Sequence, residues 1–199
     1  PHANEAIQLA ERQVRRTPDD PEWRSLLGAA FVLRGRSAFA GGAFEDALRA
    51  FGEAASVQDA LLASDPLNSS LRRDLAYTLA WQGWSARKKG TLEEAGESYR
   101  RSYDIYANLA ALEPQNIGRA IDAARAESKL AVWQLSYVTA EHDAEALDWL
   151  RLASTRLKAV QDWPRADDHR WDIESLLKEV AANEQLLERR RRQVSATNN

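Results

Sequence analysis

The segment from Asp74 to Trp84 has the pattern of a helix with two apolar faces instead of one. At 100° per residue, two stripes of side chains lie roughly 120° apart around the helix axis. The first stripe consists of Leu71, Leu75, Thr78, Gln82 and Ala86, and the second of Tyr77, Trp81, Trp84 and Lys88. A surface helix of a globular protein needs only one apolar face. The second stripe therefore either packs against another element or forms an exposed aromatic surface for a ligand.

The pattern of apolar and turn residues recurs along the chain with a period of 48 residues. Pro18, Pro66 and Pro114 are 48 residues apart, and Pro164 follows after a further 50. The segment GAFEDALRAF at 42–51 returns as GTLEEAGESY at 90–99, and a degenerate third copy covers 141–150. Agreement at independent positions with one step indicates an internal structural repeat.

Each repeat is predicted to consist of two helices. In the second repeat, Asn68 can cap the first helix and Gly90 ends it. Thr91 and Glu94 have the spacing of a capping box for the next helix, and Pro114 marks the boundary that follows. Over the whole chain, the predicted helices cover residues 3–16, 20–40, 43–64, 68–89, 91–112, 116–139, 143–161 and 167–193.

The order of residues within a unit resembles the tetratricopeptide repeat. The first two units have a leucine followed by alanine or glycine, a glycine at the turn, Glu-Glu-Ala or Glu-Asp-Ala, an aromatic residue and a closing proline. The period of that family is about 34 residues. Seven extra residues per helix are nearly two turns, so they lengthen both helices and keep the apolar stripe in almost the same direction.

This resemblance covers roughly residues 20–165 and implies an all-α, right-handed solenoid of helical hairpins with lengthened helices. The sequence DPLN at 65–68, followed by LRRDLA at 71–76, resembles the long-unit arrays of bacterial multidomain signalling proteins. Such arrays are attached to many different effectors. The resemblance therefore implies a scaffold or sensor module, and it does not name a partner.

We expect a single domain over residues 1–195 and a disordered tail over 196–199. The third repeat is degenerate, because Val138 and Thr139 replace the glycine turn. A terminal helix that covers the open end of the array is expected of a solenoid. The expected parts are an N-terminal helix at 1–18, repeats at 19–66, 67–114 and 115–164, and a capping helix at 165–195.

The amino-acid composition limits the classes of partner and of binding site that we expect for this chain. A formal charge of -3 offers no general attraction for nucleic acid or an anionic membrane. The absence of cysteine excludes disulfides and thiolate metal sites. The chain also has no run of 18 apolar residues, which would predict a membrane span. The chain contains no methionine and starts at Pro1, so we expect it to be cut from a longer protein. We expect a cytoplasmic location.

The sequence has no pattern typical of catalysis. A glycine-rich phosphate loop, a nucleophile elbow and a zinc-binding helix are all missing. The histidines His142 and His169 stand beside acidic residues, but helix caps explain these clusters better than a metal site, and Asp167 or Asp168 is expected to cap the last helix. We therefore expect no enzyme activity, no cofactor and no metal.

The run of four arginines at 189–192 allows two interpretations. It could contact nucleic acid or an anionic lipid. It also lies in the last turns of a terminal helix, where cations are favoured by the negative end of the helix dipole. We favour a solvated helix end.

The first helices of the repeats would line the concave side of a solenoid. Arginine beside aromatic rings is typical of peptide-binding surfaces, because both supply large contact areas and directed polar contacts. The pattern of a carboxylate clamp is absent, since Arg24 is followed four residues later by Gly28 and Arg72 by Ala76. The predicted groove that binds a protein or peptide consists of Arg24, Arg34, Arg72, Arg73, Tyr77, Trp84, Arg87, Lys88, Arg119, Asp122 and Arg125.

Two alternatives remain open at this level. The aromatic side chains could serve packing alone, above all Trp81, because a first helix has neighbours on both sides. The protein could also have a structural role, in which it docks against a missing effector domain or forms a homodimer. For the homodimer, the last helix offers a stripe spaced for pairing, formed by Ile173, Leu177, Val180, Glu184 and Leu187.

Overall fold

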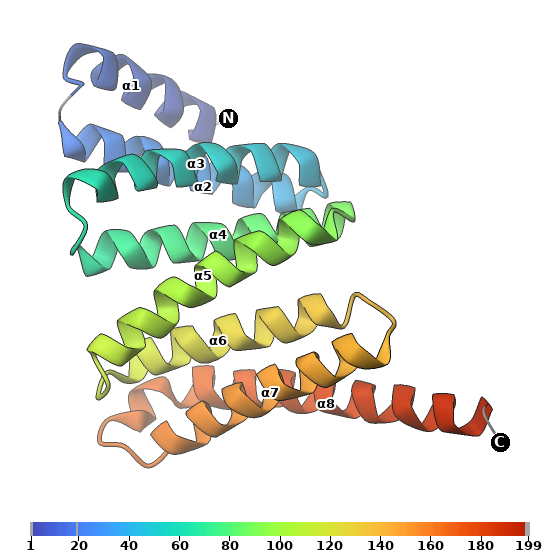
Figure 1. Cartoon of the computed structure of the whole chain (residues 1–199). Helices are drawn as coiled ribbons and strands as arrows, with labels where there is room; N and C mark the ends of the chain where they lie inside the picture. Colours follow the sequence, from blue (N-terminus) through green and yellow to red (C-terminus); the bar gives the residue numbers. More distant parts are fainter. Residues whose placement is uncertain (1, 19, 198–199) are drawn as a thin grey trace. The chain divides into compact units, whose positions relative to one another are not determined.

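The computed structural model describes the backbone of residues 2–18 and 20–197 and the side chains of residues 5–18 and 20–194. Within these residues, all regular elements are helical (Figure 1). The elements are α1 (His2–Arg16), α2 (Pro21–Ala40), α3 (Phe44–Ser64), α4 (Ser69–Lys89), α5 (Leu92–Leu112), α6 (Ile117–Gln134), α7 (Ala140–Val160), the 3-10 helix η1 (Ala166–His169) and α8 (Arg170–Thr197). The expected all-α class is confirmed.

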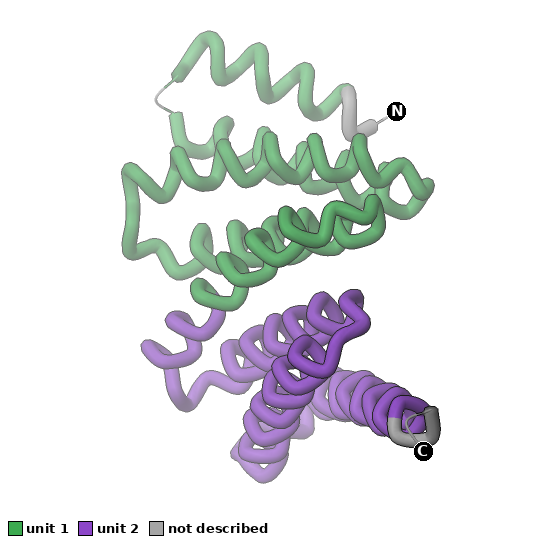
Figure 2. The backbone as a smooth tube through the Cα atoms, turned by 45° about the vertical axis from the view of Figure 1, so that its right-hand side comes forward, with its two compact units in different colours: residues 1–105 green, residues 106–199 purple. Residues whose placement is uncertain are grey.

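The chain divides into two compact units, residues 1–105 and residues 106–199 (Figure 2). We call them unit 1 and unit 2. The division falls within α5, so the helix is continuous while its two parts belong to different units. The single domain, the repeat boundaries and the handedness of a solenoid stay predictions.

Local sequence explains where the helices of the second repeat begin and end. The side chain of Asn68 accepts the N–H groups of Ser70 and Leu71. Gly90 has a φ of 96°, a left-handed conformation that ends α4 at low cost only for glycine. Thr91 Oγ1 lies 3.0 Å from Glu94 Oε2, but the Thr91 N–H donates to the carbonyl of Ala86. The predicted capping box is therefore incomplete, because the turn after α4 already uses that N–H.

In unit 1, consecutive helices pack against one another, α1 on α2, α2 on α3 and α3 on α4, and α2 also contacts α4. In two helical hairpins, a glycine of the first helix lies against an aromatic ring of the second. A Cβ atom on Gly35 would lie 2.8 Å from the ring of Phe51, and one on Gly83 would lie 2.8 Å from Tyr99. Both rings are buried. The same contact is thus made twice, one repeat apart.

In unit 2, α6 packs on α7, and α8 packs on both. The positions that correspond to glycine and aromatic ring here hold Ala131 and Leu147, and Leu147 packs against the core cluster that contains Ala131. The degenerate repeat therefore exchanges the glycine and the large ring for two residues of intermediate size.

The last helix contributes its apolar stripe to the core of unit 2. Ile173, Val180 and Leu187 are buried in that core, and Leu177 packs against it. The stripe that was expected to pair with a second copy is therefore covered within the chain.

The third predicted hairpin differs from the structure in its turn. Helix α6 ends at Gln134 instead of residue 139, and α7 begins at Ala140 instead of residue 143. Thr139 caps α7 by accepting the N–H of His142. Without a glycine or proline between the two helices, the sequence pattern gave no sign of where α6 stops.

The end of the chain differs from the prediction as well. Asp167 and Asp168, expected to cap the last helix, lie in η1, and their carboxylates pair with Arg170 and Arg165. Helix α8 continues to Thr197, so residues 196 and 197 of the expected tail are helical. Residues 198 and 199 lie outside the described residues.

Unit 2 contains a buried ion pair between α6 and α7. The side chain of Glu127 is 0% exposed, and Arg156 donates to both of its carboxylate oxygens at 2.7–3.3 Å. Burial raises the pKa of Glu127, while the hydrogen bonds and the charge of Arg156 oppose that rise. The ion pair with Arg156 therefore offsets the desolvation cost of burying the Glu127 carboxylate in unit 2.

We expect Gly83→Ala to lower the free energy of unfolding by about 1–3 kcal/mol, because the new methyl group overlaps the Tyr99 ring. Gly52→Ala is the matched control, since a Cβ there meets nothing closer than Gln82 Nε2 at 3.8 Å. In the control, the helix should gain roughly 0.5–1 kcal/mol. Urea denaturation measures both. Equal gains in the two variants would contradict the packing account.

Replacing Arg156 by leucine should destabilise the protein by about 3–5 kcal/mol at neutral pH, because an unpaired carboxylate stays buried. The folded chain would then hold the proton of Glu127 more tightly than the unfolded chain, so the loss should grow as the pH rises above the ordinary range of glutamate. The double variant Glu127→Leu with Arg156→Leu should recover most of the stability. Urea titrations at several pH values test this, and a double variant no better than Arg156→Leu would speak against it.

Candidate functional site

Five aromatic side chains meet on unit 1 where α2 ends, α3 begins and α4 passes. We call Phe39, Phe44, Tyr77, Trp81 and Trp84 the aromatic cluster. The ring centroids of Phe39 lie 4.6 Å from Trp84 and 5.3 Å from Trp81, and those of the two tryptophans are 5.0 Å apart. These are favourable distances for aromatic pairs. Trp81 and Trp84 thus pack on the first helix of the preceding repeat, and both stay half-buried.

Three large apolar side chains of α2 and α4 remain exposed, and one of them, Tyr77, belongs to this cluster. Leu26 is 47% exposed, Leu33 52% and Tyr77 39%. Leu26 and Leu33 lie three residues before and four residues after Ala29, so all three share one face of α2. The exposed residues Leu26, Leu33, Arg36, Arg73, Tyr77 and Lys88 of these two helices are called the first-helix face.

A cleft of about 230 Å³ opens between α2 and α4, with α3 as its floor. It is lined by Ser25, Ala29, Val32, Gln58, Leu61, Leu71, Asp74, Tyr77 and Thr78. The side chain of Gln58 is buried, yet its Oε1 atom has no hydrogen-bond partner among the described residues. Burial raises the pKa of Asp74, and the charge of Arg73 opposes that rise. The cleft thus combines apolar walls with two acceptor groups.

Several arginines of the predicted groove in unit 1 are held by neighbouring helices. Arg34 of α2 pairs with Glu53 of α3, and its guanidinium lies 5.0 Å from the ring centroid of Phe31. The charge of Arg87 is close enough to the hydroxyl of Tyr99 to lower the pKa of that group, against the effect of its burial. Both side chains therefore have roles in joining the helices of a hairpin.

The remaining predicted residues of unit 1 lie on α2 and α4. Arg24 and Arg72 are half-buried, and Arg73 and Lys88 are exposed. Tyr77 and Trp84 belong to the aromatic cluster, where both contact Trp81. The structure thus brings Tyr77 and Trp84 together.

The predicted residues of unit 2 take part in ion pairs. Arg119 lies 3.1 Å from Glu113, and Arg125 lies 3.4 Å from Asp172 of α8. Asp122 is buried and lies 3.6 Å from Arg125. These pairs explain the three charged residues by packing within unit 2, and their role in a groove stays a prediction.

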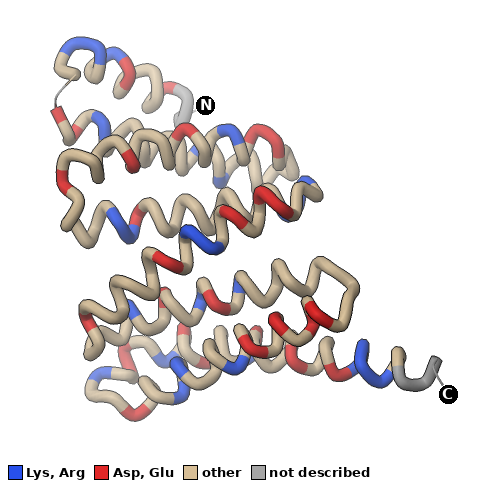
Figure 3. The backbone as a smooth tube through the Cα atoms, viewed as in Figure 1, with Lys and Arg blue, Asp and Glu red and all other residues tan. Residues whose placement is uncertain are grey.

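Basic and acidic residues are interspersed along the helices of both units (Figure 3). The arginines of the run at 189–192 in α8 differ in their contacts. Arg190 donates to the carbonyls of Leu135 and Tyr137 and to the carboxylate of Asp143, at 3.0–3.4 Å. Arg192 lies 3.4 Å from Glu188. Arg190 therefore satisfies carbonyls at the end of α6, a contact that its position in an arginine run did not reveal.

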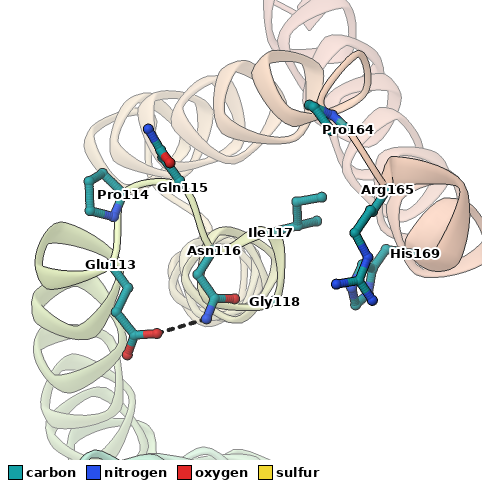
Figure 4. Close-up of a pocket in the computed structure, with 9 residues that line it drawn as sticks. All are labelled: Glu113, Pro114, Gln115, Asn116, Ile117, Gly118, Pro164, Arg165 and His169. Atoms are coloured by element: carbon teal, nitrogen blue, oxygen red, sulfur yellow. Dashed lines mark hydrogen bonds between the residues drawn. The ribbon is translucent and has the colours of Figure 1, made fainter.

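Unit 2 contains a larger hollow of about 600 Å³, lined by the turn before α6 and by the turn at η1 (Figure 4). Arg165 and His169 lie beside each other on one side of it. On the other side, Asn116 donates to Glu113, and the hydrogen bonds from Asn116 and Arg119 lower the pKa of Glu113. Arg165 also pairs with Asp168. Glu113, Asn116 and Arg165 are thus engaged in hydrogen bonds or ion pairs, and we place the candidate site on unit 1.

The clusters around the histidines are held by local contacts. His142 stacks on Tyr137 at 4.2 Å and lies 2.6 Å from the hydroxyl of Thr139. Over the residues that the structure describes, no group of three or more His, Cys, Asp or Glu side chains could hold a metal ion. No helix in this part of the chain is long and apolar enough to cross a membrane.

Sequence reasoning missed the leucines of α2 and the cleft. Leu26 and Leu33 are seven residues apart, a spacing that places two side chains on the same face of a helix. This spacing could have indicated a second apolar face on α2. Gln58 gave no such signal, because a polar residue in a second helix is expected to face solvent.

No family model matches the chain, and no curated protein matches it. Among solved structures, the chain is similar to one described as a "DHF58 filament", with 15% sequence identity and a TM-score of 0.41, over 96% of this chain and 93% of that one. A likeness at this level carries no argument. Membership of the tetratricopeptide-repeat family stays a prediction.

The burial of Tyr99 predicts an alkaline transition, because it raises the pKa of the hydroxyl more than the charge of Arg87 lowers it. Burial raises the pKa of Tyr99 to about 12, from 10.0 for an ordinary tyrosine. The folded state therefore keeps a proton that the unfolded state loses, and stability should fall by about 1.4 kcal/mol per pH unit between these values. Tyr99→Phe should lack this component, so its stability relative to the wild type should improve as the pH rises from 10 to 12. Urea denaturation at each pH checks this, and parallel curves for the two proteins would refute it.

Proposed function

We propose that this chain is a protein-interaction module that binds a protein or peptide segment through the first-helix face of unit 1. The observation that carries this proposal is the exposure of Leu26 and Leu33 on α2, the helix that supplies Ala29 and Val32 to the cleft, together with the exposure of Tyr77, which lines the cleft. Apolar side chains of this size gathered beside a hollow are typical of interaction sites. The proposal places the module in a larger signalling or regulatory protein, as the sequence resemblance implies.

The aromatic cluster supports the proposal by making this face stiff. Trp81 contacts Phe39, Phe51, Tyr77 and Trp84, so its ring is held from several sides. A surface that is ordered before binding loses less conformational entropy when the partner arrives. The guanidinium of Arg36, 5.9 Å from the Trp81 ring centroid, adds a polar group at the edge of the apolar area.

The expectation of a homodimer through the last helix loses its support, because the proposed stripe packs within unit 2. The first-helix face remains available for a segment of another protein or of another part of the parent protein. We propose no catalytic role.

A library of random peptides displayed on phage tests the proposed function. We expect selection on the purified chain to enrich peptides with apolar side chains, and calorimetry to show that Leu33→Ser weakens their binding by about ten-fold or more. Leu152→Ser is the matched control, because Leu152 is also an exposed leucine on a helix, 40% exposed on α7. The control should bind as the wild type does. The proposal would be contradicted if the enriched peptides bound the Leu33→Ser variant as tightly as the wild type, or if no peptides were enriched.

A further inference from the structure

The cleft between α2 and α4 has the size and walls for a single side chain. Its volume of about 230 Å³ is below the range of roughly 300–1,000 Å³ that is typical of small-molecule sites. Ala29, Val32, Leu61 and Leu71 make most of its walls apolar. Such walls suit the methylene groups of a long side chain that ends in a polar group.

Gln58 lines the cleft, and its buried Oε1 atom is an acceptor for which the described residues supply no donor. The residue is 7% exposed, and Oε1 has no partner among the described residues. Native structures rarely leave such an atom without a hydrogen bond, because its desolvation is not compensated. An unsatisfied acceptor that lines a cleft is therefore a reason to expect a donor from outside.

At the rim of the cleft, Asp74 adds a second acceptor and a negative charge. The residue is exposed, and partial burial of its carboxyl group raises the pKa while the charge of Arg73 opposes that rise. The aromatic side chain of Tyr77 lines the same cleft, and aromatic rings attract cations. The polar lining thus favours a donor that carries a positive charge.

We propose that the cleft takes a lysine side chain of the bound protein or peptide, with its ammonium donating to Gln58 Oε1 and facing the carboxylate of Asp74. An ammonium has three donors and no acceptor, which matches two acceptors in one cleft. The methylene groups lie against the walls formed by α2 and α4. This inference rests on the proposed function of the first-helix face and adds the chemistry of one anchor residue.

The test uses n-butylammonium, which has the stem and head group of lysine, and follows backbone amide signals of the whole chain by NMR. We expect saturable shifts for the residues that line the cleft, with millimolar affinity as befits so small a ligand. 1-Butanol has the same stem without the charge, and butyrate has the opposite charge. Both should bind about ten-fold more weakly or not at all. Equal binding of 1-butanol, preference for butyrate, or no shifts with n-butylammonium would overturn the proposal.

Two variants assign the binding to the proposed atoms. Gln58→Leu and Asp74→Asn should each weaken n-butylammonium binding by about ten-fold. Gln134→Leu, a buried glutamine of unit 2, is the matched control and should leave binding unchanged. Unchanged binding in both cleft variants would overturn the proposal.

The chain without any ligand gives an independent result. Gln58→Leu should raise the urea midpoint, because an unpaired buried acceptor is replaced by an apolar group of similar size. A lower midpoint would show that the fold itself needs the Gln58 amide, and it would overturn the proposal.

The two proposals fail separately. If selected peptides bind through Leu33 while n-butylammonium leaves the cleft signals unmoved, the module binds peptides and the lysine site is wrong. If n-butylammonium binds as expected and no peptide is enriched, the cleft chemistry stands and the proposed function falls.

Discussion

The contact between a glycine of one helix and an aromatic ring of the next is the constraint on which unit 1 depends. Gly35 lies against Phe51 and Gly83 against Tyr99, and neither site has room for one more carbon atom. This approach sets how closely the two helices of a hairpin can lie, since side chains at the contact decide the interaxial distance. The third repeat shows another solution to the same requirement, with Ala131 and Leu147 at the equivalent positions.

Once the hairpins are closed in this way, polar side chains join the helices at their margins. Arg34 reaches Glu53, Arg87 reaches Tyr99 and Arg156 reaches the buried Glu127. In unit 2, Arg190 of α8 satisfies carbonyls beyond the end of α6. Groups of this kind stabilise mainly by avoiding the cost of unpaired buried charge or unpaired carbonyls. They also remove several arginines from the set that could meet a partner.

Unit 1 is distinguished by the apolar side chains of α2 and α4 that stay exposed once its helices have packed. Trp84 is partly covered by Phe39, so the second stripe of α4 serves packing first. At its edge, Tyr77 stays exposed beside the cleft, and Leu26 and Leu33 of α2 are exposed as well. The same helices thus supply an aromatic support and an apolar face that the described residues of unit 1 leave partly exposed. Our two proposals concern that face and the acceptor groups beneath it.

The sequence by itself determined the helical class and most helix ends, because the 48-residue period, Asn68, Gly90 and the prolines act through local chemistry. Helices α2 to α5 begin and end within about one residue of the predicted positions. Only the tertiary structure decided where α6 stops and which charged residues form ion pairs with neighbouring helices. It alone also revealed Gln58 as an unpaired acceptor in a cleft. Such outcomes depend on side chains from different helices, and no local pattern in the chain records which of them will meet.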